Sequence, residues 1–350
     1  MRTHRSIRMT GLAALVIAAA TPALVERAEA APTGVTSLPI AFRVHNTNTS
    51  DVDCVSDDKA YDVVGHIAGP AALIRGGRIP AATLYLHGDA VDESMWRYSK
   101  VPGYDYAADL AGRGLVSVTI ARLGYPGSGK PDGNDLCFGS EADVAHQIIT
   151  ELRSGAYQAG GGGNAPRIDK LALAGHSAAG FIAQAEAYSY NDIAALVVVA
   201  SGEFVTPRVP AAVGEQQVRC SGSGDGYAFI EGTDAEAAAD FFHDADPAIV
   251  ADVSAHRPED ACGDLANAPA GIQADLQKLR EVKVPVLVIT GANDAFFAQP
   301  EQQAKLFSGS PDATGVTLPD TGHAITLGHT AGAFRDKMAA WLQAHGLGSA

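Results

Sequence analysis

Short apolar runs recur along most of the chain, and segments with helical spacing separate one run from the next. The runs are bounded by Gly, Pro or polar residues, which favours strands over helices. The predicted strands are Ile40–Val44, Tyr61–Ile67, Ala82–Leu86, Leu115–Ala121, Leu171–Ala174, Ala194–Ala200, Val284–Thr290 and Val316–Leu318. Because the strongest runs are almost continuously apolar, they predict a mostly parallel sheet that helices cover on both faces.

Helical patterns fill the intervals between these runs. Tyr106–Ala111 predicts a short helix that the following glycines end. A longer helix is expected to begin at Ser140, because Ser140 and Asp143 form a capping-box pattern. Another helix is expected to follow Ser177 and to run to about Tyr188.

One long stretch interrupts the alternation of strands and helices. It runs from Phe204 to Lys283, is rich in Ala and Asp, and contains two of the cysteines. Because long insertions beside a binding face are usually functional, we predict a cap over about residues 205–280. The alternative is a group of surface helices that has no influence on chemistry.

The first thirty residues have the pattern of a secretory signal. Arg2, Arg5 and Arg8 precede a run of small apolar residues, and Ala28-Glu29-Ala30 follows as a cleavage pattern. The alternative is a membrane anchor, but the apolar run is shorter than the roughly 20 residues that a spanning helix needs. We therefore expect a signal peptide over residues 1–30 and a secreted mature domain over residues 31–350, located outside the cell or in the periplasm.

Composition indicates a folded domain and excludes some partners. Hydrophobic residues make up 47% of the chain and charged residues 19%, which is enough apolar surface for a sizeable core. The formal net charge is −15, and removal of the leader's four Arg and two Glu leaves about −17. Such acidity opposes binding to nucleic acid or to anionic membranes. It does not identify a substrate, and the oligomeric state stays open.

The four cysteines predict disulfides, because an exported chain meets an oxidising environment. Cys220 and Cys262 lie in the same inserted segment, so we expect them to pair and to leave Cys54 for Cys137. The alternative is that some of them are free buried thiols. Their spacings fit neither a zinc site nor a redox motif.

Three polar side chains each follow a predicted strand. Gly175-His176-Ser177-Ala178-Ala179-Gly180 joins a strand directly to a helix, and such a sharp turn exposes the serine hydroxyl. Asp294 follows the strand Val284–Thr290, and His323 follows the last short strand. A hydroxyl, a carboxylate and an imidazole in this order at one sheet edge predict a serine nucleophile with its base and orienting acid.

From roughly Tyr61 to Leu347 the chain resembles the α/β-hydrolase superfamily, and in particular its secreted esterases and lipases. The resemblance rests on Leu86-His87-Gly88, Gly124–Pro131, Gly175–Ala179, Gly291–Asp294 and Gly322-His323. It implies an α/β-hydrolase fold, with a mostly parallel central sheet flanked by helices and an inserted cap between strands 6 and 7. It also implies that Ser177 is the nucleophile, Asp294 the acid and His323 the base.

The same resemblance assigns the oxyanion hole to the backbone N–H groups of Ala178 and Asp89, with Ala90 as the alternative to Asp89. Asp89 is unusual at this place, since a carboxylate pointing inward would repel the oxyanion. We expect its side chain to point away or to contact a polar substrate group. Two further departures are Ala179, where the family has glycine, and Arg122, which lies near a position where an aspartate is common.

Each site residue has a competitor in the sequence. Glu203 is the alternative acid, because it follows the strand Ala194–Ala200, and His329 is the alternative base. The stretch Gly124 to Lys130 has the spacing of a phosphate-binding loop, but Pro131 replaces the Ser or Thr that would hold magnesium.

We therefore expect a serine hydrolase that cleaves small or lipid-like carboxylic esters through an acyl-enzyme. The alternatives are a peptidase or amidase of the same fold, and a binding protein without activity. We expect no cofactor and no metal. His243, Asp244 and Asp246 together suggest a metal site, but a solvated acidic surface explains them better.

Overall fold

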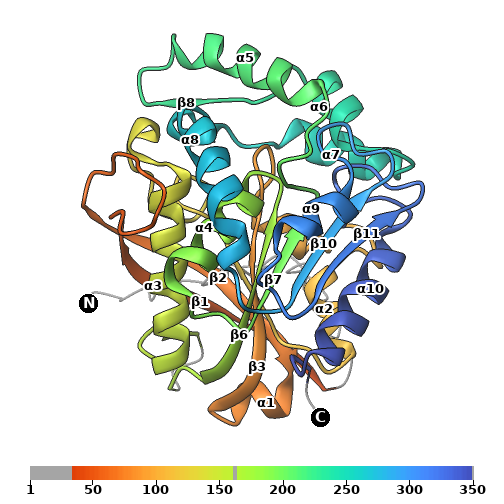
Figure 1. The fold of residues 1–350 in the computed structure, drawn as a ribbon. Coiled ribbons are helices and arrows are strands. Elements are labelled where there is room, and N and C mark those ends of the chain that lie inside the picture. The colour runs from red at the N-terminus through yellow and green to blue at the C-terminus, as the bar shows by residue number, and fades with distance from the viewer. Residues whose placement is uncertain (1–33, 161–163, 349–350) are drawn as a thin grey trace, which may run out of the picture. The chain divides into compact units, whose positions relative to one another are not determined.

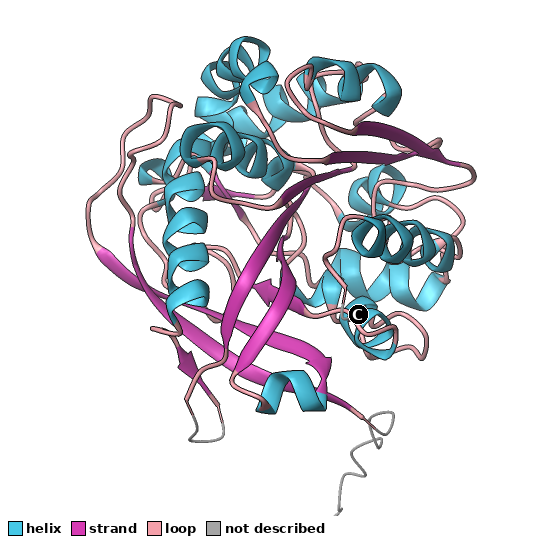
Figure 2. Cartoon of the chain, turned by 60° about the horizontal axis from the view of Figure 1, so that its bottom comes forward, coloured by secondary structure: helices cyan, strands magenta, loops and turns pink. Residues whose placement is uncertain are grey.

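The computed structural model describes residues 34–160 and 164–348, and the predicted leader lies outside these ranges. The described chain forms a nine-stranded sheet with helices on both faces (Figures 1 and 2). The strands of this sheet are β1 (Val35–His45), β2 (Ala60–Pro70), β3 (Arg78–Leu86), β4 (Ser117–Ile120), β5 (Gln158–Ala159), β6 (Arg167–His176), β7 (Ala195–Val199), β10 (Val286–Gly291) and β11 (Ala313–Leu318). The prediction of a mostly parallel sheet is confirmed.

The strand order is β11-β10-β7-β6-β3-β4-β2-β1-β5. The six strands from β11 to β4 are parallel, and their carboxyl ends meet at one edge. At the other side of the sheet, β1 and β2 form a long antiparallel pair that runs from Val35↔Pro70 to His45↔Ala60. These two strands extend well beyond the predicted Ile40–Val44 and Tyr61–Ile67. Their backbone pairing continues where the apolar pattern ends, so periodicity alone underestimates their length.

Helices on both sides of the sheet enclose the core. They are α1 (Ala71–Arg75), α2 (Tyr106–Gly112), α3 (Phe138–Ser154), α4 (Ala178–Tyr190), α5 (Arg208–Cys220), α6 (Asp234–Phe241), α7 (Pro247–Ala255), α8 (Cys262–Lys278), α9 (Pro300–Leu306) and α10 (Ala331–Ala344), with 3₁₀ turns η1 (Glu93–Trp96), η2 (Gly133–Asp135) and η3 (Leu279–Glu281). The α3–α4 pair contacts β6, whereas α2 contacts β2 and β4 and packs against α10 (Figure 1). Within the described residues, none of the helices is long and apolar enough to cross a bilayer.

The predicted start of α3 is wrong. The helix begins at Phe138, two residues before Ser140, and Cys137 is the capping residue. Ser140 Oγ accepts a hydrogen bond from the Cys137 N–H at 3.3 Å, so Ser140 occupies the third helical position. Ser140 and Asp143 therefore both lie inside the helix, and neither of them caps it. Cys137, which forms a disulfide, takes the place of the usual polar capping residue.

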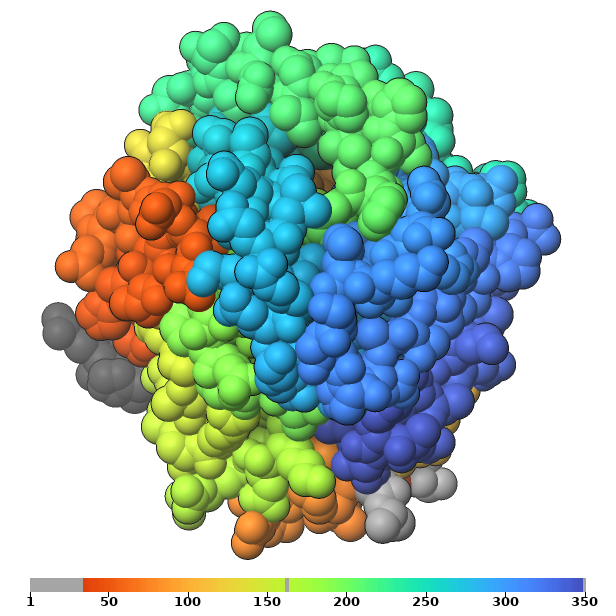
Figure 3. Space-filling model, in the orientation of Figure 1, coloured from red at the N-terminus to blue at the C-terminus, as the bar shows by residue number. Residues whose placement is uncertain are grey.

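The segment between β7 and β10 contains α5 to α8 and a two-stranded ribbon of β8 (Tyr227–Ala228) and β9 (Asp260–Ala261). It lies over the carboxyl ends of the parallel strands, at the top of Figures 1 and 3. The disulfide Cys220–Cys262 joins α5 to α8 inside this segment. Cys54–Cys137 fixes the loop after β1 to the start of α3. Both predicted pairs are confirmed.

Candidate active site

Ser177 occupies the sharp turn between β6 and α4. Its backbone has φ 55° and ψ −125°, a conformation that L-residues rarely adopt and that carries strain. The turn is so tight that a Cβ at Gly175 would lie 1.9 Å from the carbonyl oxygen of Ala179. Ala179, which replaces the family's glycine, is fully buried and lies within the first turn of α4. The turn therefore forms with alanine at this position.

The loop after β3 approaches Ser177 closely. A Cβ at Gly88 would lie 2.6 Å from the Ser177 Cβ, so only glycine permits this approach. Of the two candidate donors beyond Gly88, the Ala90 N–H is already engaged, because it donates to Asp260 Oδ1 at 2.7 Å. The Asp89 carboxylate accepts a hydrogen bond from the Tyr125 hydroxyl at 3.1 Å. The Asp89 side chain thus points toward the buried side chains of Tyr125 and Arg122, which agrees with the expectation that it points away from the oxyanion.

Asp294 and His323 form a buried pair. His323 Nδ1 lies 3.0 Å from each carboxylate oxygen of Asp294, and both side chains are inaccessible to solvent. Asp294 Oδ1 also accepts hydrogen bonds from the N–H groups of Phe296 and Phe297. These contacts fix the carboxylate, and the carboxylate in turn fixes the imidazole with Nε2 pointing away from it.

His323 also lies beside the serine turn. The ring of His176, the residue before Ser177, lies 4.7 Å from the His323 ring at a tilt of 45°, and its Nε2 lies 3.0 Å from the His323 carbonyl oxygen. His323 Nε2 is buried and makes no hydrogen bond within the described residues, so it is not bonded to Ser177. Hydrogen bonds of this kind are often long without substrate and shorten when substrate binds.

The competing residues lie in other networks. The Glu203 carboxylate accepts hydrogen bonds from Gln184 at 3.0 Å and from Gln303. His329 pairs with Asp244 at 3.1 Å on the surface. Among the described residues, neither makes a hydrogen bond to His323 or Ser177, whereas Asp294 contacts His323 directly, so the geometry favours Asp294 over Glu203 and His323 over His329.

A cavity of about 290 Å³ opens at Ser177. Around it lie Asp89, Ser177 and Ala178 on the sheet side, and Val209, Val213, Ile230, Leu265, Pro269 and Ile272 on the inserted segment. Phe241, Phe296 and Phe297 line it as well and pack against the His323 ring. Figure 3 shows an opening between the green start of α5 and the cyan atoms of α8, where the cavity meets the surface.

Comparison with known proteins identifies the family of this chain. The model of the alpha/beta hydrolase family matches residues 84–336, well over half of the chain. The chain belongs to this family. The search of curated proteins found no match.

Solved structures of hydrolases have the same fold. A thermophilic esterase from Thermogutta terrifontis is 19% identical with a TM-score of 0.59, over 87% of this chain and 99% of that one. The enol-lactonase from Burkholderia xenovorans is 18% identical with a TM-score of 0.59, over 81% and 97%. An esterase from Exiguobacterium antarcticum is 15% identical with a TM-score of 0.55, over 81% and 96%. At these identities the likeness shows the fold.

In this hydrolase a buried ionic cluster, which the sequence did not predict, joins the inserted segment to the site. Arg122 donates to both oxygens of Glu141 at 2.9 and 2.8 Å and to Asp264 Oδ2 at 2.7 Å. It also donates to the His87 carbonyl at 3.0 Å. Glu141 belongs to α3, which packs on the sheet, and Asp264 belongs to α8 of the inserted segment. One guanidinium therefore joins the inserted segment to the rest of the domain. The only signal in the sequence was a charged residue directly after an apolar strand.

Burial changes the protonation of several groups in this cluster. Burial and the neighbouring Asp89 raise the pKa of Asp260 well above its usual value, and burial and Glu141 do the same for Asp264. Burial and the Arg122 charge lower the pKa of His87 to about 3. Burial and His323 also lower the pKa of His176. Both histidines are therefore neutral near pH 7.

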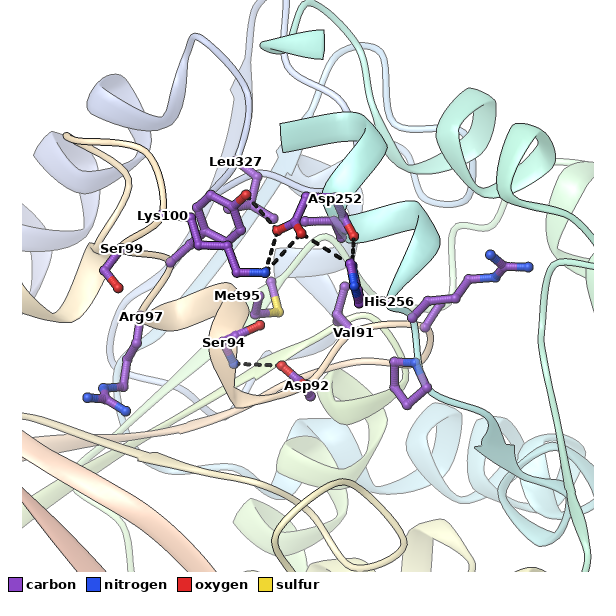
Figure 4. Close-up of a pocket in the computed structure, with 15 residues that line it drawn as sticks. Val91, Asp92, Ser94, Met95, Arg97, Ser99, Lys100, Asp252, His256 and Leu327 are labelled. Atoms are coloured by element: carbon purple, nitrogen blue, oxygen red, sulfur yellow. Dashed lines mark hydrogen bonds and ion pairs between the residues drawn. The ribbon is translucent and has the colours of Figure 1, made fainter. Parts of the chain in front are cut away.

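A second cavity, of about 300 Å³, lies between the η1 region and α7 (Figure 4). One of its lining residues is Asp252, which accepts hydrogen bonds from Tyr98 at 2.8 Å and Lys100 at 2.8 Å and lies 3.2 Å from His256. Its lining includes none of the three residues Ser177, Asp294 and His323. The apolar cavity at Ser177 is therefore the better candidate for substrate.

Proposed function

We propose that this hydrolase is exported and cleaves carboxylic esters, with Ser177 as nucleophile, His323 as base and Asp294 as the acid that orients it. The observation that carries the proposal is the buried Asp294–His323 pair, whose Nε2 is unbonded and whose imidazole contacts His176, the residue before the strained Ser177. An imidazole that is fixed at Nδ1 and unbonded at Nε2 is ready to accept a proton from a nearby hydroxyl.

The reaction follows from these groups. Ser177 Oγ forms a bond to the ester carbonyl carbon, while its proton passes to His323 Nε2. The resulting oxyanion accepts hydrogen bonds from the N–H groups of Ala178 and Asp89, each worth about 3 kcal/mol in the transition state. The alkoxy group then leaves with the proton from His323, and water attacks the acyl-enzyme in the same way. The engagement of the Ala90 N–H with Asp260 supports Asp89 as the second donor.

The chemistry of the cavity favours small apolar esters. Asp89 is the one charged residue among the described residues that line it, and its carboxylate is bonded to Tyr125. A peptidase would need a free charge to hold a peptide terminus. Glu203, a carboxylate that could hold a peptide amine, is bonded to Gln184 and Gln303. Names of proteins with similar structures, two esterases and an enol-lactonase, agree with ester chemistry.

We propose further that the inserted segment, about residues 205–280, is the cap that sets substrate size. It contributes apolar side chains from α5 and α8 to the cavity. A larger side chain there, such as Ala268→Phe, should lower kcat/KM for long acyl chains while sparing acetyl esters. Equal losses for both chain lengths would contradict a role in size selection.

Export is supported by the two disulfides, which persist in oxidising compartments. The cleavable leader remains a prediction from residues 1–30. Sequencing the N-terminus of the protein recovered from the medium or periplasm tests it, with a start near Ala31 expected and an intact N-terminus contradicting it.

A substrate panel tests the esterase proposal. Purified protein is assayed with p-nitrophenyl esters of increasing acyl length and with aminoacyl p-nitroanilides, beside a Ser177→Ala control. We expect short and medium acyl esters to be hydrolysed fastest and the control to be inactive. Faster hydrolysis of the anilides would replace the esterase by a peptidase, and an active control would remove Ser177 from the mechanism.

A further inference from the structure

Three potential metal ligands converge where α3 meets the end of α4, outside both cavities. They are His146 on α3, Glu186 on α4 and Asp192 in the loop that follows α4. One ligand atom from each lies within 4.8 Å of the others. The two helices pack against one another (Figure 1), so residues 40 positions apart in the chain reach the same point. Within the described residues, this is the one group of three such side chains.

Several polar atoms of this cluster lack hydrogen-bond partners. Four of them are buried and make no hydrogen bond within the described residues: His146 Nδ1, both oxygens of Glu186 and Asp192 Oδ1. His146 Nδ1 does lie 2.9 Å from Asp192 Oδ2, as an ion-pair contact inside the cluster. Glu186 is fully buried. Buried carboxylates without partners are costly and rare in folded proteins, and one whose oxygens both lack a donor calls for a missing ligand.

We propose that His146, Glu186 and Asp192 bind a divalent transition-metal ion, with Zn²⁺ as the probe. An imidazole and two carboxylates are a donor set that zinc accepts, and two carboxylates neutralise its charge. In a tetrahedral zinc site, ligands at about 2.0–2.2 Å from the ion lie about 3.3–3.6 Å from one another. The ligand atoms here lie within 4.8 Å of one another, so the widest separation would have to shorten by about 1 Å on binding, and Asp192 lies in a loop that can take up this movement.

Two neighbours act on this site. The Tyr190 ring stacks on the His146 ring at 4.0 Å and 9°, which fixes the imidazole as an outer-shell group would. Arg153 lies 3.3 Å from Asp192 Oδ2 and opposes a cation. Its side chain is 35% exposed, so it can move into solvent while Asp192 Oδ1 remains for the ion.

The competing explanation is a proton shared between Glu186 and Asp192, which would leave the site without a metal. The two explanations differ in what Gln does at position 186. A glutamine imitates the protonated acid and keeps its shape, but it is a much weaker zinc ligand. The site is separate from Ser177, so its occupancy concerns the packing of α3 on α4 rather than the ester chemistry.

Zinc titration of the whole purified protein tests the proposal. The protein is stripped with EDTA, dialysed, and titrated calorimetrically with ZnCl₂, and its melting temperature is followed in parallel. We expect one site per chain and a higher melting temperature with Zn²⁺. Glu186→Gln should weaken binding by about 100-fold or more, since even outer-shell changes cost 10–100-fold. The control is His329→Gln, which removes an exposed His–Asp pair and should leave the affinity unchanged.

His146→Gln is a second variant, at a partly exposed ring, in case Glu186→Gln fails to fold. It should likewise weaken binding at the single site by about 100-fold or more. Zinc affinity that is unchanged in either folded variant would overturn the proposal and assign the binding to surface histidines. Absence of a single-site isotherm in the native protein would favour the shared proton.

Discussion

The sheet edge and the inserted segment are built in different ways. At the sheet edge, Ser177, Asp294 and His323 are held by strand ends and by backbone hydrogen bonds. The inserted segment consists of the helices α5 to α8 and a two-stranded ribbon, and a disulfide and buried ion pairs hold it in place. One region owes its geometry to apolar burial, and the other to specific polar and covalent contacts.

This difference has consequences for chemistry and for stability. A change at the sheet edge should alter catalysis and leave the fold intact. A change in the buried Arg122 cluster should alter the fold first, because the cluster links α3, α8 and the loop before Ala90. The predictions below separate these two kinds of effect.

The largest effect is expected at Asp294. Asp294→Asn keeps an oxygen for the N–H groups of Phe296 and Phe297, but its amide faces His323 Nδ1 and forces the wrong tautomer. We expect kcat for a p-nitrophenyl ester to fall about 10⁴-fold, with little change in melting temperature. Glu203→Gln, at the competing acid, should retain kcat within a few-fold. The reverse ranking of the two variants would move the acid to Glu203.

The next effect concerns Arg122. Arg122→Met leaves the carboxylates of Glu141 and Asp264 buried without their partner, and breaking such a pair costs about 3–5 kcal/mol. The free energy of unfolding, measured with urea, should fall by this amount in Arg122→Met. Arg78→Met removes an exposed ion pair with Asp169 and should leave the free energy of unfolding unchanged. Equal stability of the two variants would mean that the cluster does not hold the segment.

The smallest effect is a pH dependence of stability. The pKa of His87 is about 3 in the folded chain and near 6.5 in the unfolded chain, so the unfolded chain binds one more proton between these values. The His87 contribution is complete above pH 6.5 and is lost as pH falls. We expect His87→Gln to flatten the slope of unfolding free energy between pH 6 and 5 by up to about 1.4 kcal/mol per unit. An unchanged slope would contradict a neutral buried His87.

The sequence was sufficient for the elements that apolar burial controls. The runs at β3, β6, β7 and β10 predict a parallel sheet, and the parallel sheet brings Ser177, Asp294 and His323 to one edge. The α3 cap, the Arg122 cluster and the His146 group depend on single long-range contacts, such as Arg122 with Asp264 across 142 residues. No local periodicity records a contact of this kind, so the structure was needed to find it.

The claim that most of this account depends on is that Ser177 is activated by the buried Asp294–His323 pair. Labelling with a fluorophosphonate, followed by peptide mass spectrometry, tests it most directly. We predict one adduct per chain, on Ser177, formed rapidly by the native protein and much more slowly by Asp294→Asn. An adduct on another serine, or no adduct on folded protein, would contradict it.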